Sequence, residues 1–301
     1  MGVSIYGRDA HNAAELIRNA DIAMFQSKKL GKNRFEIFSP SHHEELLENM
    51  EIENRLRVAI KDHLIEVHFQ PQVSQTSTIF GIEALARWFD PIIGTVPPQK
   101  FIQIAEETGL IDELSELIYR VALKEFKTIQ TIDPSLRLSV NLSASQLQNL
   151  NLVTTLKEMA ISYEVSPNSI MLEITEDILI ADIEQSIRNI KLLKDMGFQI
   201  SLDDFGTGYS SLSYLKDLDI DEIKIDRSFV NKQLLSDRNT AIIQAILAMS
   251  EVLRVECIVE GIETVSLLTQ LCELGCYNFQ GYYFHKPMPA YQLIELLSSP
   301  T

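Results

Sequence analysis

Apolar segments with the length of β-strands alternate with longer amphipathic segments through most of this chain, and this alternation restricts the fold more than any other feature. The longer segments include residues 98–129 and 238–254, whose apolar residues recur at helical spacing. Strands that alternate with helices predict an α/β fold with a parallel sheet, here a TIM-type (β/α)8 barrel. The expected strands are residues 64–72, 79–88, 136–143, 169–175, 199–204, 222–226, 256–260 and 279–284.

The first two expected strands depart from this scheme. Only residues 73–78 join them, whereas a crossover between parallel strands needs about a dozen residues or more. A connection this short suits an antiparallel hairpin instead. We therefore expect a modified TIM-type (β/α)8 barrel that begins with an antiparallel hairpin.

Charged and amide side chains occupy one face of most of these strands, close to the carboxyl end of each. In the segment ISLDD, Ile200 and Leu202 lie opposite Ser201 and Asp203 because side chains alternate along a strand. Helices cover the outside of a barrel, so the apolar face must point outward and the polar face inward. Barrel active sites lie at the carboxyl end of the strands. The residues expected there are Glu83, Asn141, Glu173, Asp203, Asp204, Lys224, Asp226 and Glu260.

This predicted cluster needs a source of positive charge. Several carboxylates cannot share a small, dry volume unless their charge is neutralised. Protonation and the single charge of Lys224 are two sources, and divalent cations are a third. The side chains offer oxygen atoms without histidine or cysteine, which favours Mg²⁺ or Mn²⁺, with Ca²⁺ as an alternative. The adjacent Asp203 and Asp204 suit a pair of ions that share one carboxylate.

Each of these residues, taken singly, also has a structural explanation. An inward glutamate such as Glu83 commonly belongs to a structural ion pair, and Asn141 fits a hydrogen-bonded strand end. Glu176 and Glu263 follow strands, where acidic residues stabilise helix N-termini. It is the convergence of the whole set on one end of one barrel that favours a functional site.

The composition narrows the classes of partner. The chain has 301 residues and a formal net charge of −16, which disfavours DNA because nucleic-acid binding needs a basic surface. The sequence has no apolar run long enough to span a bilayer, so we expect no membrane contact from these residues. The three cysteines show no disulfide pattern, and a reducing cytoplasm is the expected location.

Seven motifs, in order, resemble those of EAL-domain cyclic di-GMP phosphodiesterases between residues 46 and 298. They are EALARW at 83–88, NLSASQ at 141–146, LEITE at 172–176, DDFGTGYSSL at 203–212, IKIDRSFV at 223–230, VEGIET at 259–264 and QGYYFHKP at 280–287. The segment NADIAMFQSKKLGKNRFEIF resembles the C-terminal tail of a GGDEF domain, although the GGDEF signature itself is absent.

The resemblance implies three parts: a GGDEF-domain remnant at 1–38, a connecting helix at 39–61 and an EAL phosphodiesterase barrel at 62–298. It also implies a longer parent protein with an upstream GGDEF domain, a sensor domain or a membrane anchor, and assembly as a homodimer. The activity that it implies is hydrolysis of cyclic di-GMP to linear 5′-pGpG with two Mg²⁺ or Mn²⁺ ions, which lowers the level of this second messenger.

The resemblance also assigns roles to single residues. Metal ligands are matched by Glu83, Asn141, Glu173, Asp203, Asp204 and Glu260, and catalytic residues by Lys224, Glu260 and Asp203. Substrate-binding positions are matched by Arg87, Gln70, Gln280 and Asp226. Glu176 matches an acid that anchors the DFGTGYSS loop.

Two alternatives stay open. A catalytically silent receptor would bind cyclic di-GMP in the same pocket and signal through the connecting helix, and the complete set of expected ligands disfavours it. An unrelated barrel hydrolase would act on another phosphate ester, and the DDFGTGYSSL and EALARW motifs disfavour it.

Overall fold

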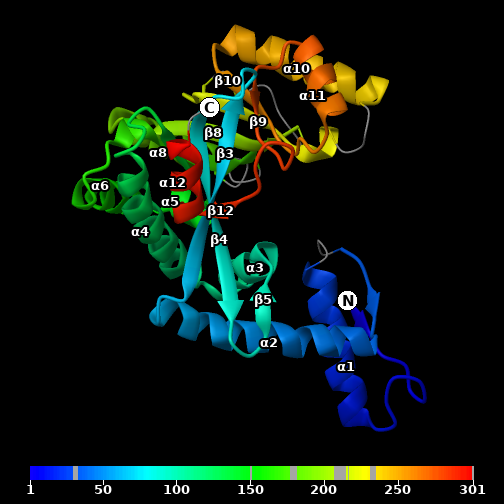
Figure 1. Cartoon of the computed structure of the whole chain (residues 1–301). Helices are drawn as coiled ribbons and strands as arrows, with labels where there is room; N and C mark the ends of the chain where they lie inside the picture. Colours follow the sequence, from blue (N-terminus) through cyan, green and yellow to red (C-terminus); the bar gives the residue numbers. More distant parts are fainter. Residues whose placement is uncertain are drawn as a thin grey trace. The chain divides into compact units, whose positions relative to one another are not determined.

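The computed structural model describes residues 1–29, 33–149, 151–176, 182–206, 215, 217–230 and 235–299 (Figure 1). The chain forms two compact units. We call Met1–Leu64 with Phe89–Leu110 the N-terminal unit, and Ile65–Trp88 with Ile111–Thr301 the barrel unit. The three-part division expected from the sequence stays a prediction.

The N-terminal unit contains a strand, a helix and a second strand within residues 1–38, followed by the expected connecting helix. The two strands pair in parallel, and a Cβ atom added at Gly2 would lie 1.9 Å from the carbonyl oxygen of Ala20, so β1 packs directly on α1. The elements of this unit are β1 (Gly2–Val3), α1 (Ala13–Lys29), β2 (Glu36–Ile37), α2 (Pro40–Lys61), β5 (Gly94–Val96) and α3 (Pro98–Thr108).

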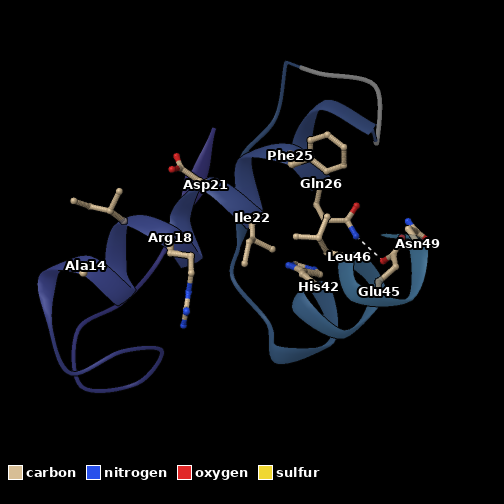
Figure 2. A pocket seen from close by; sticks show the side chains of 11 residues that line it. Ala14, Arg18, Asp21, Ile22, Phe25, Gln26, His42, Glu45, Leu46 and Asn49 are labelled. Atoms are coloured by element: carbon tan, nitrogen blue, oxygen red, sulfur yellow. Dashed lines mark hydrogen bonds between the residues drawn. The ribbon is translucent and has the colours of Figure 1, made fainter. Parts of the chain in front are cut away.

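A cavity of about 490 Å³ lies between α1 and α2 within this unit (Figure 2). Apolar side chains such as Ile17, Phe25 and Leu46 line it, and Gln26 Nε2 donates a hydrogen bond of 2.5 Å to Glu45 Oε2 at its edge. None of the site residues predicted from the sequence lines this cavity, because all of them belong to the barrel unit.

The barrel unit is built on a closed ring of eight strands, as the sequence predicts. Around the ring the order is β3, β11, β10, β9, β8, β7, β6 and β4, and β4 pairs with β3 to close it. β3 runs antiparallel to both of its neighbours, which confirms the antiparallel first hairpin. The strands are β3 (Ile65–Ser74), β4 (Ile79–Asp90), β6 (Arg137–Asn141), β7 (Ile170–Thr175), β8 (Gln199–Phe205), β9 (Glu222–Ile225), β10 (Glu256–Val259) and β11 (Asn278–Phe279), with β12 (Met288–Pro289) outside the ring on β3.

Helices cover the apolar outer face of the ring. Ile200 and Leu202 of β8 and Phe126 of α4 are fully buried in the core between strands and helices. Burying an apolar side chain of this size stabilises the fold by roughly 1.5–3 kcal/mol, so the apolar face of each strand is held outward. The helices are α4 (Ile111–Ile129), α5 (Ala144–Gln148), α6 (Leu152–Ser162), α8 (Ile183–Asp195), α10 (Asp237–Leu253), α11 (Val265–Glu273) and α12 (Ala290–Ser298), with short 3-10 helices η1 (Pro167–Ser169) and η2 (Arg227–Phe229). No helix in these described ranges is long and apolar enough to cross a membrane.

Two expected elements differ in the structure. The amphipathic segment 98–129 forms two helices rather than one, because Gly109 adopts a left-handed conformation (φ 73°) that ends α3. The last strand ends at Phe279 instead of continuing to residue 284. The chain turns there around Ile262, whose N–H donates to the Gln280 carbonyl and whose carbonyl accepts from the Tyr283 N–H. Gly281 permits this turn, since an added Cβ would lie 2.2 Å from the Ile262 carbonyl oxygen.

Candidate active site

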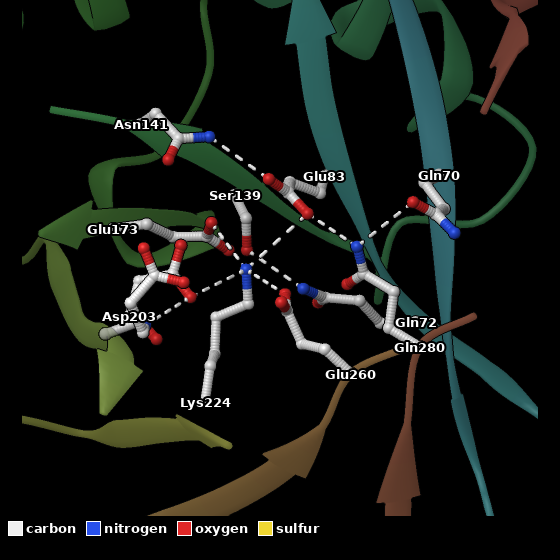
Figure 3. A network of polar contacts seen from close by, with 12 residues as sticks. Gln70, Gln72, Glu83, Ser139, Asn141, Glu173, Asp203, Lys224, Glu260 and Gln280 are labelled. Carbon is white, nitrogen blue, oxygen red and sulfur yellow. Dashed lines mark hydrogen bonds and ion pairs between the residues drawn. The ribbon is translucent and has the colours of Figure 1, made fainter. Parts of the chain in front are cut away.

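The carboxyl ends of the barrel strands bring together the polar side chains predicted from strand alternation (Figure 3). Glu83 lies on β4, Glu173 on β7 and Asp203 on β8, while Asn141 ends β6. The register pairs Asn141 with Glu173 on the neighbouring strand. These side chains surround Lys224, which reaches into the barrel from β9.

Lys224 is the centre of the cluster and is completely buried. Its Nζ lies 2.6 Å from Glu260 Oε1 and 2.8 Å from Glu173 Oε2. Glu83 Oε2 and Asp203 Oδ1 are slightly farther away, at 3.5 and 3.6 Å. One ammonium group therefore faces four carboxylates, and if all four were ionised, three negative charges would remain uncompensated.

Amide side chains hold Glu83 in place. Gln280 Nε2 donates to Glu83 Oε2 over 2.5 Å, and Asn141 Nδ2 donates to Glu83 Oε1 over 3.1 Å. Gln280 Nε2 also lies 3.4 Å from Gln70 Oε1, and Gln70 Nε2 donates to the carbonyl of His285. The predicted residues Gln70 and Gln280 thus belong to the same hydrogen-bonded network as the carboxylates (Figure 3).

A bulge in β8 explains how two successive aspartates reach one site. Neighbouring side chains on a regular strand point to opposite faces. The register between β8 and β9 shifts between Leu202 and Phe205, so that two residues of β8 take the place of one. Asp203 and Asp204 occupy this shift, and Asp204 adopts a left-handed conformation with φ 53°. Aspartate tolerates that region better than most residues, and its backbone N–H donates to Asp203 Oδ1 over 2.9 Å.

The crowding of carboxylates changes their affinities for protons. Burial raises the pKa of Glu260 to about 8, and the negative charges of Asp203 and Glu83 act in the same direction. Burial and the charges of Asp203 and Asp226 raise the pKa of Asp204 to about 6. Burial opposes the charge of Lys224, but four carboxylates outweigh it and hold the Lys224 pKa well above its usual value.

Glu83 and Glu173 illustrate how the protons are shared. Burial and the charge of Glu83 raise the pKa of Glu173 well above its usual range. Burial acts in the same way on Glu83, but Lys224 and the hydrogen bonds from Gln280 and Asn141 outweigh it, and its pKa is lowered. In the metal-free site Glu173 therefore keeps a proton more readily than Glu83.

The residues present fit divalent cations in chemistry. In the described part of the chain no three carboxylate, histidine or cysteine side chains are already arranged around an ion position, and Lys224 Nζ lies among the carboxylates instead. Glu173 Oε1 and Gln280 Oε1 are buried oxygens without hydrogen-bond partners, and such atoms are expected to bind an ion or water. An all-oxygen donor set with excess negative charge suits Mg²⁺ or Mn²⁺.

Comparison with known proteins agrees with this geometry. The EAL domain family model matches residues 53–287, which include every strand of the ring. The chain belongs to the EAL domain family. The EAL barrel is similar over 81% of the chain to a solved structure described as the PaMucR phosphodiesterase in complex with c-di-GMP, with a TM-score of 0.77, 36% identity and 99% of that structure covered.

Two curated relatives of the EAL chain are named as cyclic di-GMP phosphodiesterases. NbdA of Pseudomonas aeruginosa is 37% identical over 99% of this chain, and PdeR of Escherichia coli is 34% identical over 96% of it. Both are much longer proteins, since the chain spans 38% of NbdA and 44% of PdeR.

Two further predicted residues, Arg87 and Asp226, lie near the EAL site without contacting Lys224. Arg87 is half-buried on β4, and its Nη1 donates to the carbonyl of Ala86. Burial lowers the Arg87 pKa, which Tyr282 and Glu83 partly offset. Asp226 follows β9, where its Oδ1 accepts from the Ser228 N–H at the start of η2.

Glu176, the predicted loop anchor, is buried directly after β7. Residues 207–211 of the loop that it is predicted to anchor lie outside the described residues. The anchoring role therefore stays a prediction.

Sequence reasoning missed residues that support the EAL site from the barrel interior and from a surrounding helix. Ser139 lies on β6 close to Lys224 and accepts a hydrogen bond from Gln72 Nε2 over 3.4 Å (Figure 3). Tyr119 of α4 donates from its hydroxyl to the Asn141 carbonyl over 2.6 Å. Strand alternation marks Gln72 and Ser139 as inward-facing, but no sequence signal connects a helical tyrosine with a particular strand end.

Proposed function

We propose that this EAL domain hydrolyses one phosphodiester bond of cyclic di-GMP and releases linear 5′-pGpG. The observation that carries the proposal is the buried Lys224 ammonium within 3.6 Å of four carboxylates at the carboxyl end of the barrel. The names of NbdA and PdeR support the choice of substrate, as does the c-di-GMP complex of the similar PaMucR structure.

Two Mg²⁺ or Mn²⁺ ions are the proposed cofactors. The residues that would hold them are Glu83, Asn141, Glu173, Asp203, Asp204 and Glu260. When bound, such ions activate water and offset the charge of the phosphate. The protein itself contributes the excess negative charge that attracts them and the bulge of β8, which presents two adjacent carboxylates to one site.

Lys224 and Glu260 are the proposed catalytic pair, together with Asp203. Lys224 orients the attacking water, and Glu260 accepts its proton while the oxygen bonds to phosphorus. The bond to the ribose 3′ oxygen breaks, and this oxygen takes up a proton from solvent water to become the 3′ hydroxyl of the product. Arg87 contacts the phosphate, and Gln70, Gln280 and Asp226 position the rest of the substrate.

The residues that precede the barrel are the subject of a separate proposal. We infer that residues 1–38 are the C-terminal part of a GGDEF domain and that 39–61 connect it to the barrel. The alignment supports this, because NbdA and PdeR match nearly the whole chain while the EAL model begins only at residue 53. A homodimer and an upstream sensor domain stay predictions from the resemblance, and a cytoplasmic location stays a prediction from the cysteine pattern.

Product analysis tests the proposed activity. Purified protein with cyclic di-GMP is expected to release 5′-pGpG in Mg²⁺ or Mn²⁺ and to release none in excess EDTA, as measured by chromatography. Cyclic di-GMP binding without any product in a metal-loaded sample would favour the silent receptor. If neither binding nor product occurred, while another phosphate ester was hydrolysed, the barrel would be a different hydrolase.

The affinity for Mn²⁺ is expected to rise with pH. The metal-free site holds protons on Asp204 below pH 6 and on Glu260 below pH 8, and ligands must lose them to bind a metal. Below the pKa of a ligand, the affinity for the metal rises about tenfold for each pH unit, because the metal must displace one proton from that ligand. The affinity should therefore increase through this window and level off above it. Calorimetric titrations in buffers of different ionisation heat measure both the affinity and the protons released.

The variant Glu260→Gln is the matched control for this pH dependence. It lacks the group that titrates at about pH 8, so the rise in Mn²⁺ affinity between pH 6 and pH 8 should be less steep than in the unmodified protein. An affinity that does not change with pH in the unmodified protein would contradict the assignment of protonated carboxylates to the metal-free site.

A further inference from the structure

A second layer of charge lies inside the barrel at the opposite end from the site. Arg137 begins β6, and its Nη2 lies 2.5 Å from Glu222 Oε2 at the start of β9. Its Nη1 lies 3.0 Å from Glu256 Oε2 at the start of β10. β7 and β8 separate β6 from β9 in the ring, so the Arg137 side chain crosses the interior of the barrel instead of pairing with a neighbouring strand.

Glu222 is the most buried charged residue of this layer, and both of its carboxylate oxygens have a partner. It is completely buried, and its second oxygen accepts from the Ser201 hydroxyl over 2.9 Å. Ser201 and Glu222 are register partners on β8 and β9, and Glu222 is also the register partner of Glu256 on β10. The Glu222 carboxylate therefore contacts Ser201 of β8 and Arg137 of β6. Arg137 in turn contacts Glu256 of β10.

The barrel leaves space for the crossing arginine at one position. Gly81 of β4 is the register partner of Arg137. A Cβ atom added there would lie 2.4 Å from Gln72 Oε1 and 3.1 Å from Arg137 Cγ. The Arg137 guanidinium also lies 4.8 Å from the centre of the Phe80 ring, a distance that gives an attractive cation–π contact.

Each member of this layer shares a strand and a face with a residue of the site. Ser201 precedes Asp203 by two residues on β8, and Glu222 precedes Lys224 by two residues on β9. Arg137 and Glu256 stand four residues before Asn141 and Glu260 on the same strand faces. Ser139 with Gln72 lies between the two layers. The position of the Arg137–Glu222 layer along the barrel axis therefore determines where the carboxylates of the site lie along the same axis.

We propose that Arg137 and Glu222 are positioning residues for metal binding, an inference that rests on the proposed function. Their ion pair across the barrel holds β6, β8, β9 and β10 at the relative heights that bring the carboxylates around one point. Their described hydrogen bonds and ion pairs are to each other, to Glu256 and to Ser201, and none of these is a proposed metal ligand. Residues that hydrogen-bond directly to metal ligands change metal affinity by about 10- to 100-fold when they are replaced, and we expect an effect at the lower end of this range because Arg137 and Glu222 act through the strands.

The test is the double variant Arg137→Met with Glu222→Leu. Replacing Arg137 alone would leave the buried Glu222 carboxylate without its cation, whereas apolar replacement of both members of a buried pair commonly preserves stability. We expect a thermal midpoint close to that of the unmodified protein and an Mn²⁺ dissociation constant about tenfold higher by calorimetry, with a lower kcat at saturating Mn²⁺. The matched control is Arg120→Met with Glu116→Leu, an exposed ion pair on α4, which should change none of the three quantities.

An unchanged Mn²⁺ affinity and kcat in a folded double variant would overturn the proposal and leave the pair with a purely structural role. If the double variant does not fold, Arg137→Lys decides, because lysine keeps the charge but not the forked geometry that reaches both Glu222 and Glu256. A folded Arg137→Lys protein should bind Mn²⁺ more weakly, and unmodified binding there would equally refute the role. Failure of the unmodified protein to bind Mn²⁺ would instead refute the proposed function.

Discussion

Replacing Asp203 by alanine is expected to lower kcat for cyclic di-GMP hydrolysis by about 1000-fold or more, as loss of a single group that stabilises the transition state can do. Asp203 is a proposed ligand of both ions, and it lies 3.6 Å from Lys224 at the start of the β8 bulge. Its loss removes a ligand and one of the charges that attract the metal. Product release should be measured at several Mn²⁺ concentrations, since weaker metal binding alone would be partly reversed at high Mn²⁺.

Two further variants sharpen this test. Asp203→Asn keeps the side-chain shape and an oxygen for the Asp204 N–H, so it separates loss of charge from collapse of the bulge. Asp219→Asn is the control, because Asp219 is a largely exposed carboxylate. Glu83→Ala should abolish hydrolysis like Asp203→Ala. Substantial activity in both variants would rule out the proposed metal site.

Replacing Lys224 by methionine is expected to lower kcat by about 100- to 1000-fold while the dissociation constant for cyclic di-GMP stays close to that of the unmodified protein. Lys224 is completely buried and points into the cluster, so its proposed role is in the chemical step rather than in holding the substrate. An interaction made only in the transition state lowers kcat when it is lost, without raising KM. A raised KM with unchanged kcat would show that Lys224 serves ground-state binding.

Stability must be followed in the same variant. Without Lys224 the carboxylates lose their only close cation among the described ion pairs, and breaking a buried pair destabilises a protein by about 3–5 kcal/mol. Bound metal should restore stability because it binds the folded state alone. Thermal unfolding of Lys224→Met should therefore respond more strongly to Mn²⁺ than that of the unmodified protein. Lys127→Met removes a half-exposed lysine and serves as the control.

Much of the site could be predicted because strand alternation is a local rule. Glu83, Glu173 and Lys224 each face inward for the same reason, namely that their neighbours are apolar and are buried under helices. Their convergence then follows from closure of the ring, which the count of strands and the short first hairpin already indicate. The contacts around Lys224 required only that these strand ends meet.

The features that could not be predicted depend on pairing between distant segments. The bulge of β8 is defined by the register with β9, and the sequence of β8 alone reads as a regular strand. Arg137 and Glu222 are 85 residues apart, and each resembles an ordinary charged residue at a strand start. The early end of β11 depends on the backbone of Ile262, which periodicity within residues 279–284 does not contain.

The bulge between Leu202 and Phe205 makes the site sensitive to chain length as well as to side-chain identity. A deletion of one aspartate at this point would let β8 pair regularly with β9 and would leave one carboxylate at the mouth where there are now two. The barrel would keep its ring and its buried outer face, but the two proposed ions would lose one of the adjacent carboxylates that would hold them. The number of residues between these two apolar positions therefore decides whether one or two adjacent carboxylates reach the proposed metal site.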